Sequence, residues 1–182
     1  YQRAVRAPNV NELFGGQSVG FPGASDPCSL ASAAGNATIR DLCIATGVPS
    51  SAVGSSTLQL NTQIQGLFGG NPDLQEETSD SYTAGVVIRP TAVPGLSMTV
   101  DYFNIKVKDY ISTLGGGLAN SLNLCYNVIQ SLDSQYCQVF MGARNALGQF
   151  DGTVPPAILN ANTGALKTEG VDFQLDYSTG LP

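Results

Sequence analysis

The stretch that decides the fold reads Gly70-Asn71-Pro72-Asp73-Leu74-Gln75-Glu76-Glu77-Thr78-Ser79-Asp80-Ser81-Tyr82-Thr83-Ala84-Gly85. It opens with residues that favour a turn, passes through two adjacent acids, and ends at the start of an alternating run. A run that alternates apolar and polar residues is typical of a strand with one apolar and one polar face. The stretch therefore predicts a turn that leads into a β-strand.

Two more alternating runs follow along the chain. The last run places one set of residues on an apolar face and the other on a polar face: Val171, Phe173, Leu175 and Tyr177 against Asp172, Gln174 and Asp176. In the middle run, apolar residues fall on even positions from Met98 to Tyr102 and on odd positions from Phe103 to Val107. Such a change of phase indicates either a β-bulge or a strand that passes from one environment to another.

Short and long connections alternate between the predicted strands. The segment 89–96 holds Pro90, Pro94 and Gly95, which favour a tight reversal. The other two connections are long, and compact soluble domains rarely contain such connections. We predict strands at about residues 1–7, 74–89, 97–111 and 166–178, with long loops at about 8–73 and 112–165.

Each long loop holds two cysteines and a predicted short helix. Apolar residues at helical spacing predict helices over 36–46, capped by Thr38 and ended by Gly47, and over 118–132. Four cysteines allow three pairings, and closeness in sequence favours Cys28–Cys43 and Cys125–Cys137. Such disulfides persist in an oxidising compartment such as a periplasm or a cell surface. Four buried free thiols in a cytosolic protein are the alternative.

The composition excludes several classes of protein. A chain of 182 residues with 42% hydrophobic residues suggests one folded domain, while 12% charged residues is low for a soluble surface. A net charge of −6 with scattered basic residues argues against a nucleic-acid partner. The chain has no histidine, so the Gly16–Gly20 match to the G-x-S-x-G pattern lacks its base. No enzyme activity, cofactor or metal site is predicted.

Four short motifs carry a family resemblance. They are Arg6-Ala7-Pro8-Asn9, Gly70-Asn71-Pro72-Asp73-Leu74 with Glu77, Asp101-Tyr102-Phe103-Asn104-Ile105, and Gly170-Val171-Asp172. Each motif alone is weak, but their order and the intervening turn make the set specific. Over nearly its whole length the chain resembles the β-barrel of TonB-dependent outer-membrane receptors. The resemblance implies a mainly β fold: antiparallel strands from a transmembrane β-barrel, with long disulfide-tied loops that contain short helices.

The resemblance also implies a function and a location. Residues 1–182 would be a fragment of one β-barrel domain in the outer membrane of a Gram-negative bacterium. The plug and the TonB box of the family have no counterpart here, and Tyr1-Gln2-Arg3 resembles the middle of a strand, so we expect a truncated piece. The full protein would import a scarce large nutrient such as an iron–siderophore, a cobalamin or an oligosaccharide.

The expected partners follow from that function. They are outer-membrane lipid, the remaining barrel strands and plug, TonB acting through that plug, and a small-molecule or oligosaccharide ligand, without nucleic acid. Candidate ligand contacts in the second loop are Tyr126, Tyr136, Phe140 and Arg144, although these side chains also suit the packing of the loop's own core. Asp101, Asp172 and Asp176 lack the spacing of a calcium loop and fit a polar barrel interior.

The sequence is also compatible with a second function. A secreted or surface-attached β domain that binds a carbohydrate or a protein partner would share several of these features. The strand faces discriminate between the two functions. A barrel wall has an apolar exterior band about 25 Å tall, whereas a binding domain buries its apolar face against a second sheet.

Overall fold

The computed structural model describes residues 1–179, and the chain divides into two compact units. The sheet unit comprises Tyr1–Ala7, Gln75–Tyr110 and the residues from Gly164 onward. The loop unit comprises Pro8–Leu74 and Ile111–Thr163. Within the described residues, no helix is both long enough and apolar enough to cross a membrane.

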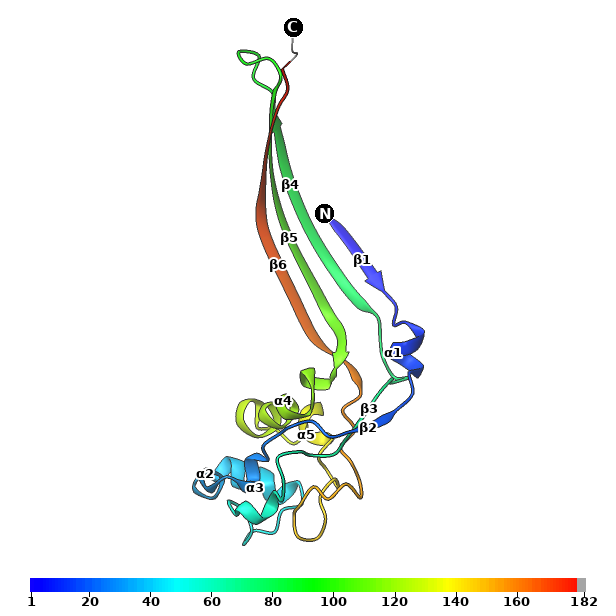
Figure 1. Ribbon diagram of the computed structural model, residues 1–182, viewed down its shortest axis with the longest axis vertical. Coiled ribbons are helices and arrows are strands. Elements are labelled where there is room, and N and C mark those ends of the chain that lie inside the picture. The colour runs from blue at the N-terminus through cyan, green and yellow to red at the C-terminus, as the bar shows by residue number, and fades with distance from the viewer. Residues whose placement is uncertain (180–182) are drawn as a thin grey trace. The chain divides into compact units, whose positions relative to one another are not determined.

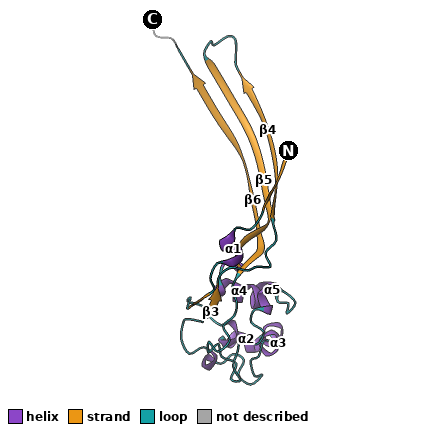
Figure 2. Cartoon of the chain, turned by 90° about the vertical axis from the view of Figure 1, so that its right-hand side faces the viewer, coloured by secondary structure: helices purple, strands orange, loops and turns teal. Residues whose placement is uncertain are grey.

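Three long strands and the short strand β1 make up the sheet (Figures 1 and 2). They are β1 (Gln2–Arg6), β4 (Glu77–Ile88), β5 (Leu96–Thr113) and β6 (Asn160–Tyr177), in the order β1-β4-β5-β6. Both β1 and β5 pair antiparallel with β4, which confirms the predicted antiparallel, mainly β class. β6 begins at Asn160 rather than near residue 166, so the second loop is shorter than the sequence indicated.

The ladder between β4 and β5 explains the change of phase in β5. Pairing runs without interruption from Thr78, opposite Lys108, to Ile88, opposite Met98. A bulge would insert a residue on one strand and shift the register, so this part of the ladder contains none. Of the two explanations that the sequence allowed, the strand therefore takes the second: it changes environment, immediately after Tyr102.

The register assigns the residues of the sheet to two faces. Directly opposed residues of an antiparallel pair point to the same side. Asn104 Nδ2 donates to Glu169 Oε2 at 2.7 Å, which places Glu169 and its alternate neighbours on the face of Asn104. Over the half of the sheet next to the 89–95 turn, this face is apolar and consists of Ala84, Val86, Ile88, Met98, Val100, Val171, Phe173 and Leu175.

The opposite face of the same half is largely polar. It carries Thr83, Gly85, Val87, Thr99, Asp101, Asp172, Gln174 and Asp176. On the apolar face, Val171, Phe173 and Leu175 are 64%, 61% and 55% exposed, so no described residue covers them. An uncovered apolar face of this kind requires an apolar medium or a partner surface.

The loop unit is built from short elements. They are α1 (Val10–Phe14), β2 (Ser18–Gly20), η1 (Pro27–Ser29), α2 (Ala31–Gly35), α3 (Ala37–Ala45), η2 (Ser56–Leu58), β3 (Gly66–Phe68), η3 (Leu114–Gly116), α4 (Leu118–Asn123), the π-helical turn η4 (Leu124–Ile129) and α5 (Gln135–Gln138). β2 pairs antiparallel with β3, and Leu67 of β3 also bridges Ala157. These pairings join the first long loop to the segment around Ala157 in the second long loop.

The sequence motifs Arg6–Asn9 and Gly70–Leu74 meet at α1. Asn9 caps this helix: its Oδ1 accepts from Glu12 N at 2.9 Å, and Glu12 Oε2 accepts from Asn9 N at 2.8 Å. Gly70 N donates to Gly15 O at 3.0 Å, and Asn71 N donates to Glu12 O at 2.9 Å. A Cβ on Gly70 would lie 2.6 Å from Gly15 N, so the close approach requires glycine here.

The predicted loop helices form with corrected ends. The N-cap of α3 is Asn36, whose side chain accepts from Ile39 N at 3.2 Å, so the expectation that Thr38 caps the helix is wrong. Gly47 follows the helix with a φ of +105°, as expected of a residue that ends a helix. The helix predicted over 118–132 is α4 followed by η4, and it ends where Gln130 takes a φ of +53°.

Two disulfides lie in one core within the loop unit. Cys28 bonds to Cys43 and Cys125 bonds to Cys137, and all four residues are 0% exposed. The core around them contains the buried apolar residues Ala33, Leu42, Val48, Val53, Leu58, Ile64, Leu114, Leu118, Leu122, Tyr126, Phe140 and Ile158. The pairing matches the one that closeness in sequence favours. Because both disulfides border the same core, the two long loops form one folded body.

Candidate functional site

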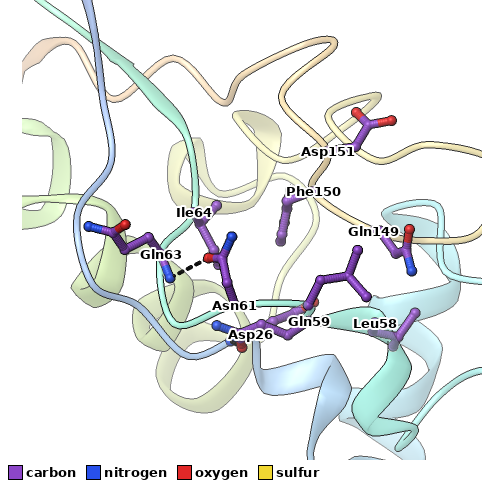
Figure 3. A pocket seen from close by; sticks show the side chains of 10 residues that line it. Asp26, Leu58, Gln59, Asn61, Gln63, Ile64, Gln149, Phe150 and Asp151 are labelled. Carbon is purple, nitrogen blue, oxygen red and sulfur yellow. Dashed lines mark hydrogen bonds between the residues drawn. The ribbon is translucent and has the colours of Figure 1, made fainter.

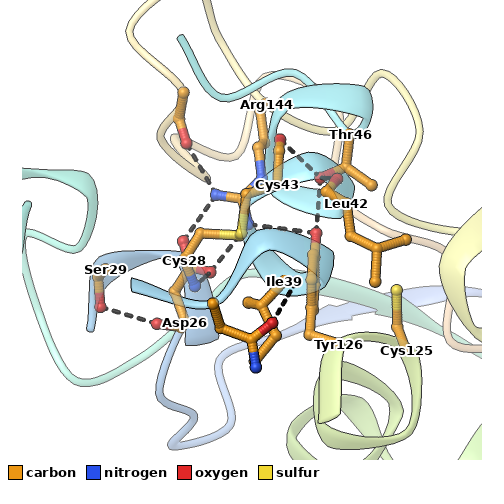
Figure 4. The surroundings of a disulfide bond; sticks show 12 residues. Asp26, Cys28, Ser29, Ile39, Leu42, Cys43, Thr46, Cys125, Tyr126 and Arg144 are labelled. Carbon is orange, nitrogen blue, oxygen red and sulfur yellow. Dashed lines mark hydrogen bonds and ion pairs between the residues drawn. A yellow bond between two sulfur atoms is a disulfide. The ribbon is translucent and has the colours of Figure 1, made fainter. Parts of the chain in front are cut away.

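A buried ion pair joins the two long loops at the centre of their core (Figure 4). Arg144 Nη1 donates to Asp26 Oδ2 at 2.6 Å, and Arg144 Nη2 donates to Asp26 Oδ1 at 2.8 Å. Both side chains are 0% exposed. Asp26 Oδ1 also accepts from Cys28 N at 3.0 Å, so the ion pair adjoins the first disulfide. A bidentate arginine–carboxylate pair has a fixed geometry, which orients the two loops relative to each other.

A chain of hydroxyl groups extends the ion pair. Arg144 Nη2 lies 3.4 Å from the Tyr126 hydroxyl, which lies 2.7 Å from Thr46 Oγ1. Thr46 Oγ1 in turn donates to Leu42 O at 3.0 Å. A guanidinium only donates, so the Tyr126 hydroxyl accepts from Arg144. Because the one hydroxyl proton of Thr46 is donated to a main-chain carbonyl, the Tyr126 hydroxyl donates to Thr46. The donor direction is therefore fixed along the whole chain, from one loop to the other.

Burial governs the protonation of this network. Burial raises the pKa of the Tyr126 hydroxyl, so the residue stays neutral. Burial is the largest single influence and would lower the pKa of the Arg144 guanidinium, but the hydrogen bonds and charge interactions with Asp26 and Tyr126 together outweigh it, and the pKa lies above its ordinary value. The Arg144 guanidinium consequently stays positively charged in this buried network.

The structure places three of the four candidate ligand contacts inside this core. Tyr126 and Phe140 are 0% exposed, and the Arg144 side chain is 0% exposed. Tyr136 is half-buried and packs against the core. Direct ligand contact by these four residues stays a prediction. Besides the bonds to Asp26 and Thr46, Phe140 packs against Tyr126 and Phe150, and the Phe150 ring centroid lies 3.9 Å from the Arg144 guanidinium carbon.

Phe150 and Asp26 connect the buried network to a pocket (Figure 3). The pocket has a volume of 230 Å³ and is lined by Asp26, Leu58, Gln59, Leu60, Asn61, Gln63, Ile64, Gln149, Phe150 and Asp151. Its walls come from the segment 58–64 of the first loop and the segment 149–151 of the second. A shallower groove of 750 Å³ shares Gln59, Leu60 and Asn61 with it.

Hydrogen bonds to the main chain hold the amides of the pocket in place. Gln59 Oε1 accepts from Asp26 N at 2.7 Å, and Gln149 Nε2 donates to Thr57 O at 2.8 Å. Asn61 is exposed, and its Oδ1 accepts from Gln63 N at 2.7 Å. Of these amides, that of Asn61 is the one whose nitrogen no described contact uses. The pocket thus offers planar amide groups beside an aromatic ring, which suits a ligand rich in hydroxyl groups.

The charge around the pocket is negative. A hydrogen bond from Thr153 N lowers the pKa of the exposed Asp151 carboxyl, so Asp151 is charged at neutral pH. The loop unit holds six acidic residues (Glu12, Asp26, Asp41, Asp73, Asp133, Asp151) and two basic ones (Arg40, Arg144), a net charge of −4. Arg144 is buried with Asp26, and Arg40 lies 3.4 Å from Asp41. An anionic ligand would therefore meet little compensating charge.

Several residues of this site carry no sequence pattern of their own. Asp26, Thr46, Asn61 and Phe150 were not predicted, because each becomes part of the site only through a contact across the chain. Asp26 and Arg144 are separated by 118 positions. The one local indication is that Asp26 precedes Pro27 and Cys28, where an acidic residue favours capping a helical turn.

The comparisons with known proteins agree with the geometry. The model of the family described as TonB dependent receptor-like, beta-barrel, matches residues 1–181. No curated protein and no solved structure gave a match. A sheet with an uncovered apolar face, a polar opposite face and long disulfide-tied loops is typical of outer-membrane β-barrel proteins. The chain belongs to the TonB-dependent receptor β-barrel family.

Membership of this family confirms the predicted resemblance and fold class. It assigns to the chain the general role of a TonB-dependent receptor, with the Gram-negative outer membrane as its place and transport rather than catalysis as its class of function. The polar face carries Asp101, Asp172 and Asp176, and carboxylates cannot face hydrocarbon at low cost.

Proposed function

We propose that these residues form one section of the wall of a larger barrel domain, together with two of its outer loops. The barrel would import a large, neutral, hydrogen-bonding nutrient, with energy supplied by TonB through a plug. Among an iron–siderophore, a cobalamin and an oligosaccharide, the loop unit favours the oligosaccharide. The observation that carries this choice is the amide-lined pocket in a unit with a net charge of −4.

The open edges of the sheet support the proposal of a larger barrel. β1 and β6 are the outer strands of the four-stranded sheet, and each has one neighbour among the described residues. In lipid every backbone N–H and C=O must be paired, so a wall of four strands requires further strands on both sides. A free-standing β domain would instead need a second sheet over Phe173, and within residues 1–179 no such sheet exists.

Neighbouring substitutions in β6 test the placement in lipid. Phe173→Lys puts a charge on the apolar face, whereas Gln174→Lys puts the same charge on the polar face. We expect Phe173→Lys to lower the free energy of unfolding from bilayers by about 2–4 kcal/mol, which is a loss of stability, and Gln174→Lys to have little effect. The measurement is reversible unfolding by guanidinium chloride in vesicles. Equal costs for the two lysines would contradict a wall with one lipid face.

A substitution in the pocket tests the ligand class. Asn61→Ala removes an exposed amide, and Asn127→Ala is the matched control, since Asn127 bonds to Asn123 and lines no part of the pocket. We expect Asn61→Ala to weaken the binding of neutral glucan or chitin oligomers by about two- to tenfold, the worth of one hydrogen bond. Calorimetry on the purified receptor gives the affinities.

The same calorimetry includes a competing ligand class. A trianionic ferric catecholate is expected to bind the receptor weakly, because the exposed charge of the loop unit is mostly negative. If this chelate binds tightly and Asn61→Ala does not change its affinity, the proposal of an oligosaccharide is wrong, and an iron–siderophore is the better candidate for the nutrient. The wall proposal would be unaffected by that result, because Phe173→Lys tests it separately.

A further inference from the structure

The lipid-side face of the sheet changes character at a row of three tyrosines. Tyr82 of β4 lies beside Tyr102 of β5, since Ala84 pairs with Tyr102 and Tyr82 with Asn104. The ring of Tyr1 lies 4.9 Å from that of Tyr82, which extends the row to the edge of the sheet. Tyrosine side chains gather at the level of the lipid headgroups, where one end of the ring is apolar and the other is wet. The row therefore marks one rim of the apolar band.

Beyond this rim the same face becomes charged. Arg3 pairs with Asp80, and Asp80 pairs with Lys106, so these three residues form one row across three strands. Lys108 follows two residues after Lys106 and pairs with Thr78. Lys167 lies on the same face as Glu169, 3.1 Å from its carboxylate. The reverse side of this region of β5 carries Phe103, Ile105 and Val107, so the polarity of the sheet is inverted.

The charges in this region are not balanced. We call Arg3, Lys106, Lys108 and Lys167 the cationic belt. Two acids accompany it: Asp80, whose carboxylate lies 3.6 Å from Lys108, and Glu169. The belt thus holds four of the eight basic residues of a chain whose net charge is −6, against two acids. All four side chains are exposed, and lysine and arginine stems lie easily along an apolar surface while their charged ends reach outward.

We propose that the cationic belt binds the phosphate groups of anionic lipids in the outer leaflet, a step that rests on the proposed placement of the wall in the membrane. Three observations combine. The belt is on the lipid side, it begins at the tyrosine rim where headgroups lie, and its excess of positive charge complements phosphate. The belt lies at the strand ends that continue into the long loops, which are the extracellular side of such barrels. The lipid is thus bound on the lipid-facing side of the wall.

The test uses the receptor purified from outer membranes and reconstituted into two kinds of vesicle. Both contain phosphatidylcholine with one-tenth lipid A, which either carries its two phosphates or is dephosphorylated. The variant Arg3→Gln/Lys106→Gln/Lys108→Gln/Lys167→Gln removes the belt, and Lys106→Arg/Lys108→Arg/Lys167→Arg keeps its charge. Arg40→Gln is the control, because Arg40 is an exposed cation of the loop unit. Native mass spectrometry counts the lipid A that stays bound, and a thermal melt in each vesicle verifies folding.

The expected result is a strong preference of the wild-type receptor for the phosphorylated lipid. Each cation near an anionic lipid surface contributes about fivefold to binding. We expect the quadruple glutamine variant to lose at least tenfold in lipid retention, while the arginine variant and Arg40→Gln retain it. Equal retention by wild type and glutamine variant overturns the proposal. Displacement of lipid A by millimolar inorganic phosphate also overturns it, since the belt would then be a site for free anions.

The two proposals fail in different ways. If the wall does not enter the membrane, the wild-type receptor inserts into neither kind of vesicle, and both proposals are rejected. If the wall enters the membrane but the belt does not recognise phosphate, insertion succeeds and both lipids are retained equally. The second outcome leaves the transporter proposal standing and removes the lipid site alone.

Discussion

Replacement of Arg144 by methionine is expected to lower the free energy of unfolding of the loop unit by about 3–5 kcal/mol. The substitution leaves the Asp26 carboxylate buried with no cation, and Asp26 is 0% exposed. A buried charge without a partner is far more costly than the pair is favourable, because desolvation is no longer offset. The variant also loses the donor to Gly148 O at 2.8 Å and the guanidinium above Phe150.

Hydrogen exchange measures this effect where it occurs. Amides of α3 and α4 report on the opening of the loop unit, and amides of β4 report on the sheet unit in the same sample. Arg40→Met is the control, since Arg40 and Asp41 are exposed and such a pair is worth roughly 0–1 kcal/mol. The double variant Asp26→Leu/Arg144→Met is expected to be more stable than Arg144→Met alone. If both single variants exchange at the same rate, the buried pair does not hold the loops together.

Removal of one disulfide is expected to cost the loop unit about 3 kcal/mol. Cys28–Cys43 and Cys125–Cys137 close segments with sequence separations of 15 and 12, and a loop of about 15 residues corresponds to about 3 kcal/mol of lost chain entropy in the unfolded state. Both bonds border one core, so loss of either is expected to loosen the helices of both loops. The substitutions are Cys28→Ala/Cys43→Ala and Cys125→Ala/Cys137→Ala.

The cysteine variants are compared by unfolding in urea, with and without a reductant. All cysteines of the described residues are in these two bonds, so a reductant changes nothing else in the chain. Reduction is expected to destabilise each double variant further, since the other bond remains to be broken. A variant in which only the loop that lost its bond opens would show that the two loops fold independently, against the single core described here.

The strands of the sheet were predictable from the sequence because the alternation of apolar and polar residues lies within each strand. A period of two in residues 171–177 places Phe173 and Gln174 on opposite faces, whatever the neighbouring strands are. The phase change after Tyr102 was also visible, but its cause was not. The sequence allowed a bulge or a change of environment, and only the unbroken pairing of Thr78 to Ile88 with β5 decides between them.

The candidate site was not predictable, because its contacts join distant positions. Tyr126, Phe140 and Arg144 were identified as a group from their types, yet their burial depends on Asp26 and Thr46 in the other loop. The error at Thr38 has a local reason. Asn36 lies two positions earlier, and asparagine is preferred over threonine as a capping residue, so the ranking of the two residue types would have favoured Asn36.

The ion pair between Asp26 and Arg144 has a consequence for engineering and for the exchange of segments between relatives. A chimera that receives one loop from another receptor would keep one half of a buried charge pair and one half of a shared core. Such a hybrid is expected to lose stability in its transplanted segment even when the strands that it joins are well matched. Grafting is therefore expected to succeed only when both loops are transferred together, as two stretches of sequence separated by β4 and β5.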